Sequence, residues 1–189
     1  MLREPERAAI DRLWQRKLSQ DAAGLPKSER HRNLEPASAA FLCALAIGVG
    51  AKRMLEIGGS SGISTIALAS AAREVNGTLI SIEIDAARQT ESRETLRRLN
   101  LERFVDYVCG DAIEVLPSVA QMDLVLLDCE KEDYIGFFDM LNVSRGGFVI
   151  ADNIISHSLN DYVAHVRKTP MVESITFNIG KGLEVTRFP

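Results

Sequence analysis

Residues 53–64 decide the fold, and their sequence is RMLEIGGSSGIS. The residues up to Ile57 form a strand-like apolar run, the glycines indicate a tight turn, and the remainder begins a helix. Glycine lets the backbone adopt positive φ and approach a ligand closely. Ser64 lies in the first helical turn, near the positive end of the helix dipole. Because ligands bind at the carboxyl ends of strands in α/β sheets, this loop favours a ligand site.

Strands and helices alternate on either side of this stretch. Strands are expected at 53–57, 78–82, 104–109, 123–127, 148–151, 172–178 and 183–187. Helices are expected at 5–19, 36–49, 63–72, 86–99, 112–116, 134–141 and 159–168. This alternation predicts an α/β fold, a mostly parallel seven-stranded sheet with helices on both faces. The turn Gly180-Lys181-Gly182 predicts that the last two strands form an antiparallel hairpin.

Length and charge limit the class of protein. The chain of 189 residues suits a single domain, with an N-terminal helix and loop at 1–33 and the α/β core at 34–189. Its formal net charge of −4 argues against a general nucleic-acid binder, which would show a basic face. The basic cluster at 27–32 is interpreted as a solvated loop, with a contact to an anionic substrate as the alternative.

Nothing in the sequence indicates secretion or a membrane. The N-terminus is charged from Arg3 and lacks the apolar core of a signal peptide. The longest apolar stretch, 37–50, is too short to span a bilayer. The cysteines, Cys43, Cys109 and Cys129, are expected to be buried or half-buried thiols without a disulfide. We therefore expect a cytoplasmic protein with no membrane partner.

Acidic residues follow the second and third strands. Glu83 stands between two isoleucines, at a position suited to binding both ribose hydroxyls. Asp85 and Asp111 are helix-cap candidates, although Asp111 ends its strand at the same sheet edge. Together with the glycine loop, these acids indicate a nucleoside-shaped site.

A dinucleotide-dependent dehydrogenase is the main competing class of enzyme. Its usual G-x-G-x-x-G motif brings a pyrophosphate against the middle glycine. Here the spacing is Glu56-x-Gly58-x-x-x-Gly62, with Gly59 adjacent to Gly58. This spacing favours a donor that has no pyrophosphate.

The fourth and fifth strands end in Asp128 and in Asp152-Asn153. If these strands are neighbours, two carboxylates and an amide oxygen meet at one edge, and these are ligands that Mg²⁺ takes. The alternative is that each of them is a helix cap or a loop acid. Lys131 is either a solvated charge or, beside a metal-bound hydroxyl, a general base. His157 follows the same loop and is assigned a surface or packing role, with reach into the site as the alternative.

Taken together, these motifs resemble those of the cation-dependent O-methyltransferase family, which includes catechol and caffeoyl-coenzyme A O-methyltransferases. The resemblance runs from about Leu34 to Arg187 and is carried by LEIGGSSGIS (55–64), Glu83, GDA (110–112), DCEKEDY (128–134), GGFVIADN (146–153) and GKGLEVTR (180–187). It implies a Rossmann-like methyltransferase fold that uses S-adenosyl-L-methionine and Mg²⁺ or another divalent cation. The implied reaction methylates a hydroxyl of a small catechol-like or phenolic acceptor. The resemblance also implies a homodimer.

The resemblance assigns a role to each motif. The methionine part of the donor would be held by Glu56, Gly58, Gly59 and Ser64, with Leu34 lining it. Glu83 would take the ribose, Asp111 and Ala112 would border the adenine, and Asp128 would also face the donor. Asp128, Asp152 and Asn153 match the metal ligands, and Lys131 matches the proposed catalytic base.

The chain departs from the family pattern near the acceptor. The stretch 153–180 is shorter than in well-studied relatives, and Cys129 follows the metal aspartate where other residues are usual. Two alternatives therefore stay open beside the metal-assisted enzyme. One is a metal-independent small-molecule methyltransferase, and the other is a donor-binding protein without turnover. The N-terminal helix, with Trp14, is expected to cover the acceptor pocket or to pack on a second subunit.

Overall fold

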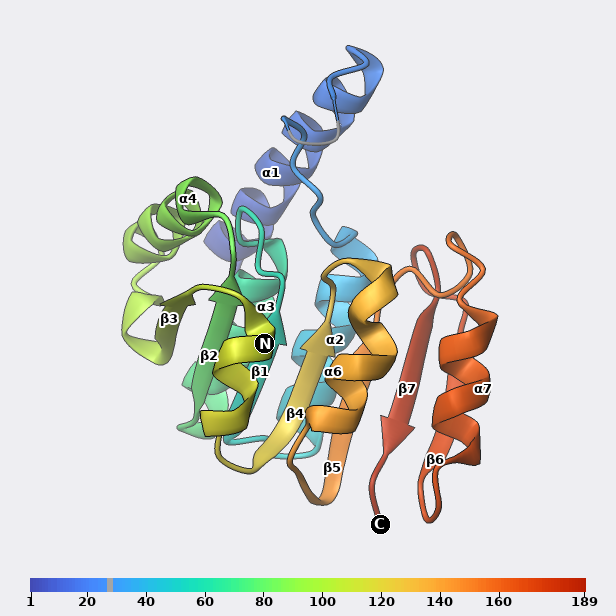
Figure 1. The fold of residues 1–189 in the computed structure, drawn as a ribbon. Coiled ribbons are helices and arrows are strands. Elements are labelled where there is room, and N and C mark those ends of the chain that lie inside the picture. Colours follow the sequence, from blue (N-terminus) through green and yellow to red (C-terminus); the bar gives the residue numbers. More distant parts are fainter. Residues whose placement is uncertain (27–28) are drawn as a thin grey trace.

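The computed structural model describes residues 1–26 and 29–189, which form one seven-stranded sheet with helices on both faces (Figure 1). The strands are β1 (Arg53–Ile57), β2 (Thr78–Glu83), β3 (Val105–Cys109), β4 (Met122–Leu127), β5 (Val143–Ala151), β6 (Glu173–Phe177) and β7 (Leu183–Arg187). Their order across the sheet is β3-β2-β1-β4-β5-β7-β6. Strands β1 to β5 are parallel, and β7 is antiparallel to both β5 and β6. The predicted fold class is confirmed.

Each predicted helix is present, with ends shifted by a few residues. The helices are α1 (Glu4–Ala22), α2 (Pro36–Gly48), α3 (Ile63–Val75), α4 (Ala86–Arg98), α5 (Ala112–Val115), α6 (Tyr134–Met140) and α7 (Asn160–Lys168). Side chains of Asp85 and Asp111 accept hydrogen bonds from the first backbone N–H groups of α4 and α5, as predicted for N-caps. Of the basic cluster at 27–32, Lys27 and Ser28 lie outside the described residues.

The sheet separates two apolar cores, because successive side chains of a strand point to opposite faces. In β4, Leu124 and Leu126 pack in the core with α1 to α4, whereas Val125 and Leu127 pack in the core with α5 to α7. All four side chains are fully buried. A strand covered on both faces is apolar throughout, which explains the continuous run at this position.

Strand β5 is longer than predicted and begins at Val143 instead of Phe148. Its pairing with β4 shifts between Met122 and Leu124, so that the start of β5 bulges out of register. Gly146 has a φ of +77°, and a Cβ on Gly147 would lie 2.8 Å from the Ser144 carbonyl oxygen. The glycines permit the bulge. Because glycine is uncommon inside strands, the sequence did not predict that β5 begins before Phe148.

One prediction about the cysteines is wrong. Cys43 is buried and Cys129 is half-buried, but Cys109 is exposed. Cys109 ends β3, the edge strand of the sheet, which has a neighbouring strand, β2, on one side only. All three are free thiols, as predicted.

Helix α1 packs on α3 and continues past the carboxyl edge of the parallel strands (Figure 1). Glu6 on α1 is buried and paired with Arg73 on α3, which ties the beginning of α1 to the core. Within the described residues, no helix has the length and apolarity needed to cross a membrane.

Candidate active site

The glycine loop lies directly against the end of β4. Gly58 has a φ of +93°, and a Cβ at this position would lie 2.4 Å from the Asp128 carbonyl oxygen. Gly62 has a φ of +107° and caps the N-terminus of α3. Both positions are therefore restricted to glycine by backbone conformation or by contact. The loop brings its backbone within reach of any ligand bound at the edge shared by β1 and β4.

Glu56 is a fully buried carboxylate beneath this loop. Its Oε2 accepts hydrogen bonds from Thr65 Oγ1 at 2.8 Å and from Ser81 Oγ at 2.7 Å. Burial raises the pKa of Glu56 above its usual value. Oε1 has no partner among the described residues, and a buried acceptor without a donor is suited to a ligand that brings one.

Glu83 is oriented by two backbone donors. Its Oε2 accepts from Ser60 N at 2.7 Å and its Oε1 accepts from Asp85 N at 2.9 Å. These bonds hold the carboxylate at the end of β2, with lone pairs remaining on both oxygens. A cavity of about 180 Å³ opens beside it, lined in part by Gly58, Glu83, Asp111, Ala112 and Asp128. We call it the donor cavity.

Two of the three predicted metal ligands, Asp128 and Asp152, lie close together at the same carboxyl edge of the sheet. β4 and β5 are parallel neighbours with Leu127 opposite Ala151, so Asp128 and Asp152 follow directly on adjacent strands. Asp152 is buried, and its Oδ1 has no hydrogen-bond partner among the described residues. Burial, together with the charge of Asp128, raises the pKa of Asp152 to about 7. Asn153 has a positive φ of 65°, which turns the chain away from β5.

Lys131 is held between two groups of this site. Its Nζ donates to Asp128 Oδ1 at 3.1 Å and to the Tyr134 hydroxyl at 2.7 Å. That hydroxyl in turn donates to the Leu127 carbonyl oxygen at 2.8 Å. Burial raises the pKa of Tyr134 well above its usual value, so the hydroxyl stays protonated. The 3₁₀ turn Lys131–Asp133 positions the amine, and Tyr134 fixes its direction.

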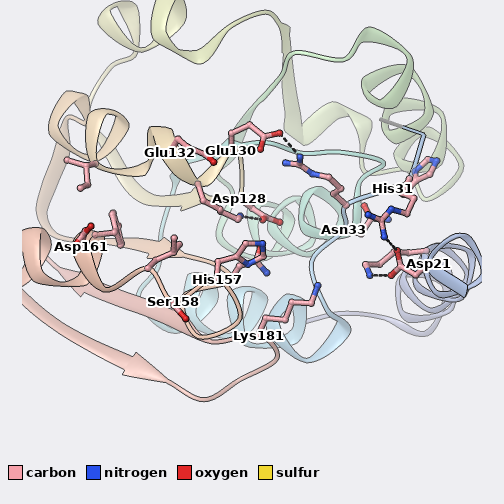
Figure 2. Close-up of a pocket in the computed structure, with 18 residues that line it drawn as sticks. Asp21, His31, Asn33, Asp128, Glu130, Glu132, His157, Ser158, Asp161 and Lys181 are labelled. Carbon is pink, nitrogen blue, oxygen red and sulfur yellow. Dashed lines mark hydrogen bonds and ion pairs between the residues drawn. The ribbon is translucent and has the colours of Figure 1, made fainter. Parts of the chain in front are cut away.

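A second, larger cavity of about 780 Å³ is also lined by Asp128 (Figure 2). We call it the acceptor cavity. Its lining comes from five parts of the chain: the end of α1, the loop 30–33, the loop after β4 with the start of α6, the loop after β5 with the start of α7, and the turn between β6 and β7. Figure 2 shows Asp21, Asn33, Asp128, His157 and Lys181 around the same space.

The predicted site residues divide into three groups. Gly58, Glu83, Asp111, Ala112 and Asp128 line the donor cavity. Asp128, Lys131 and Asn153 line the acceptor cavity. A third group lies just beneath the surface of the site, each member buried or tightly packed: Leu34, Glu56, Gly59, Ser64 and Asp152.

Several residues at the site were not singled out from the sequence. Arg32, interpreted from the sequence only as a member of the basic cluster at 27–32, lines both cavities and forms an ion pair with Glu130. Asn33 exchanges hydrogen bonds with the buried Ser61 hydroxyl and so joins the loop before α2 to the glycine loop. These partners are far apart in the sequence, and no local pattern identifies them. The i, i+3 spacing of Lys131 and Tyr134 was a usable signal for their contact.

Comparison with known proteins identifies the family. The chain belongs to the O-methyltransferase family, whose model matches residues 8–186. The catechol O-methyltransferase of Mycobacterium tuberculosis is 33% identical over 139 residues, which cover 71% of this chain and 61% of that protein. This chain spans about three fifths of the length of the curated relatives it matches.

Solved structures agree with this assignment. Cofactor-bound Rv0187 from MTB has a TM-score of 0.81 at 25% identity, over 98% of this chain and 90% of that one. The O-methyltransferase from Bacillus cereus in complex with SAH has a TM-score of 0.79 at 21% identity, over 96% and 91% of the two chains. At 21% identity, the comparison with the Bacillus cereus protein shows a similar fold. The family resemblance predicted from the motifs is confirmed.

Proposed function

We propose that this protein transfers a methyl group from S-adenosyl-L-methionine to one hydroxyl of a small catechol-like or phenolic acceptor, with the help of a divalent cation. The observation that carries this proposal is the position of Asp128, which lines the donor cavity and the acceptor cavity at once. Two ligands bound on either side of one carboxylate would meet where a group can pass between them. Holding two reactants in line supplies a large part of the rate gain in such a transfer.

The donor side fits a methionine-linked nucleoside. Glu83 has lone pairs for two ribose hydroxyls, and Asp111 with Ala112 borders the space beyond it. Glu56 Oε1 lacks a donor, which suits a nearby cationic or N–H-bearing group such as the methionine amine. Gly58, Gly59, Ser64 and Leu34 keep their proposed roles as the walls of this part of the site. S-adenosyl-L-methionine, when bound, would supply a methyl group activated on a sulfonium.

The acidic trio fits a hard divalent cation. The buried carboxylates of Asp128 and Asp152 repel each other, and Asp152 Oδ1 lacks a hydrogen-bond partner among the described residues. A bound cation would reduce the repulsion and would give Oδ1 a partner. In the described part of the chain no three His, Cys, Asp or Glu side chains gather around one point. The proposed third ligand is therefore a neutral group, the amide oxygen of Asn153, which lines the acceptor cavity together with Asp128. A bound Mg²⁺ would lower the pKa of an acceptor hydroxyl.

Lys131 is the proposed base. In its neutral form the amine takes the proton of the acceptor hydroxyl, while Asp128 and Tyr134 hold Nζ in place. The hydroxyl oxygen then attacks the methyl carbon, the carbon–sulfur bond breaks, and its electron pair stays on sulfur. Glu83 and the glycine loop keep the donor in line during this displacement.

Chelation and one substitution test the proposal. Methylation of catechol should require Mg²⁺, stop with EDTA, and be lost in Asp152→Ala. Calorimetry with S-adenosylhomocysteine should show that the donor side of that variant is intact. Methylation indifferent to both treatments would instead support the metal-independent methyltransferase. Donor binding without any methylation would support the binding protein, and stabilisation by NAD alone would support the dehydrogenase.

We further propose that residues 1–189 act as one domain and that two chains form a homodimer, as the family resemblance implies. Light scattering of the purified protein should give twice the mass of one chain. A measured mass equal to that of one chain would contradict the dimer. A single cooperative unfolding transition is expected for one domain.

A further inference from the structure

We propose that the acceptor cavity recognises a carboxylate on the acceptor, through the ammonium group of Lys181. The preferred substrate class would therefore be catechol acids instead of neutral catechols. This inference rests on the proposed function and narrows its acceptor. It comes from four observations: where Lys181 lies, how firmly it is held, how the other cations are paired, and how large the cavity is.

Lys181 is held by the turn between β6 and β7. Its carbonyl oxygen accepts hydrogen bonds from the backbone N–H groups of Ile155 and Ser156, each at 3.1 Å. Gly180 and Gly182 on either side have φ values of +56° and +92°. A Cβ on Gly182 would lie 2.5 Å from Ile155 Cγ1, so the turn and the loop after β5 fit only with glycine there. The Lys181 side chain therefore leaves from a fixed point.

The side chain of Lys181 enters the acceptor cavity from the side opposite Asp128 (Figure 2). It is half-buried, and within the described parts of the chain no hydrogen bond or ion pair engages its ammonium group. His157, on the loop that Lys181 holds, also projects into this space. A half-buried amine facing a cavity is suited to an anion that enters with a ligand.

The other cationic side chains of this cavity are already neutralised. Lys17 and Arg30 both pair with Asp21, Arg32 pairs with Glu130, and Lys131 pairs with Asp128. A carboxylate arriving on a ligand would have to compete with these partners at every one of those sites. Lys181 has no ion pair of this kind in the described part of the chain, and its charge acts on Asp128 and Asp152 without a hydrogen bond to either. The positive potential available to a ligand is thus concentrated at Lys181.

The cavity has room for an acceptor that spans from Asp128 to Lys181. Its volume of about 780 Å³ is in the upper part of the range for small-molecule sites, roughly 300–1,000 Å³. A dihydroxylated ring at Asp128 and Lys131 leaves space for a side chain pointing away from the reacting hydroxyl. A carboxylate on that side chain would reach the ammonium group.

Pairs of acceptors that differ only in a carboxylate or an alcohol separate the effect of the acceptor's charge from the effect of its shape. The assay compares 3,4-dihydroxy derivatives of benzoate, phenylacetate and phenylpropionate with the primary alcohol corresponding to each acid. The two members of a pair share the ring, the catechol and the chain length. For at least one pair, kcat/KM should be higher for the acid by about tenfold or more, the size expected of a charge-assisted hydrogen bond.

Substitutions then assign the preference to Lys181. Lys181→Met should remove the preference by raising KM for the acid, with kcat and the kinetics of the alcohol unchanged. Lys181→Arg should keep most of the preference for the acid over the alcohol. Lys168→Met is the matched control, since Lys168 is an exposed lysine at the end of α7 and should change neither substrate. Calorimetry with S-adenosylhomocysteine confirms that each variant is folded.

Three results would overturn the inference. Equal kcat/KM for acids and alcohols would mean that the carboxylate is not recognised. An acid preference that survives in Lys181→Met would place recognition elsewhere. Equal losses for acid and alcohol in Lys181→Met would mean that Lys181 acts only through the potential it exerts on Asp128 and Asp152. The proposed function fails separately, if no catechol is methylated although S-adenosylhomocysteine binds.

Discussion

The donor cavity and the acceptor cavity share Asp128, yet they are built in opposite ways. On the donor side the polar groups are buried and oriented by nearby backbone, as Glu83 is by Ser60 N and Asp85 N. On the acceptor side they are charged side chains held mainly by one another, as Lys17 and Arg30 are by Asp21. The donor cavity is thus shaped by the strand ends themselves. The acceptor cavity is shaped by loops that can vary without disturbing the sheet.

This contrast teaches where specificity can change. A change on the donor side alters buried hydrogen bonds or backbone contacts and should cost both binding and stability. A change on the acceptor side alters partly solvated charges and should cost much less. Asp128 lines both cavities, as Arg32 and Glu130 do, and Lys131 joins this boundary through its ion pair with Asp128. Four experiments test the contrast.

The largest effect is expected at the boundary, from Lys131→Met. Loss of the proposed base should lower kcat by about 10²–10⁴-fold, the usual contribution of general acid–base catalysis. Affinity for S-adenosylhomocysteine should be unchanged, because Lys131 does not line the donor cavity. Single-turnover methylation with saturating acceptor measures the loss. An unaltered rate would remove Lys131 from the mechanism.

Gly58→Ala should give the next largest effect. The new Cβ would meet the Asp128 carbonyl oxygen at 2.4 Å in a backbone conformation that favours glycine. We expect a destabilisation of about 2–4 kcal/mol, typical of strain at a special φ, and a loss of donor binding. Chemical denaturation and calorimetry measure both. Gly136→Ala in α6, where a Cβ meets nothing within 4 Å, is the control and should be neutral or stabilising.

Glu83→Gln should have an intermediate effect on the donor side. An amide nitrogen would face a backbone N–H, and the charge that attracts the ribose hydroxyls would be lost. Affinity for S-adenosylhomocysteine should fall roughly tenfold to hundredfold, as expected for hydrogen bonds to a charged group. Asp85→Asn is the control, because asparagine is also a good N-cap for α4. Equal affinities in the two variants would contradict the ribose role of Glu83.

The smallest effect is expected from the partly solvated ion pair between Arg32 and Glu130, which line both cavities. Arg32→Ala and Glu130→Ala remove a pair whose side chains are 31% and 51% exposed. A double-mutant cycle should give a coupling of about 1 kcal/mol or less in stability. KM for the acceptor should change by a few-fold at most. A coupling well above this value would show that the two sides of Asp128 are less different than their construction indicates.

Much of the donor side was predictable because its signals are local. Glycines between an apolar strand and a helix, an acid at the next strand end, and cap residues before α4 and α5 each act on their own segment. The meeting of Asp128 and Asp152 also followed from the expected order of parallel strands. By contrast, the burial of Glu56 with Thr65 and Ser81 depends on two further segments packing over it.

The acceptor side was less predictable for a physical reason. Its cavity is lined by five segments, and the contribution of each depends on how loops fold back over the sheet. Lys181 looked like part of a tight turn, and only its neighbours in space give it a cavity to face. Arg32 and Glu130 are 98 residues apart, and their pairing has no local signature.

The order of apolar and polar residues was enough to define the alternation of strands and helices, the edge at which ligands bind, and the acids that end each strand. These features depend on backbone geometry and on burial, which act over a few residues at a time. The tertiary structure alone decided which charges are neutralised, which carboxylate is left without a donor, and which amine faces the acceptor. Those outcomes depend on electrostatics between distant segments, which only the folded chain brings together.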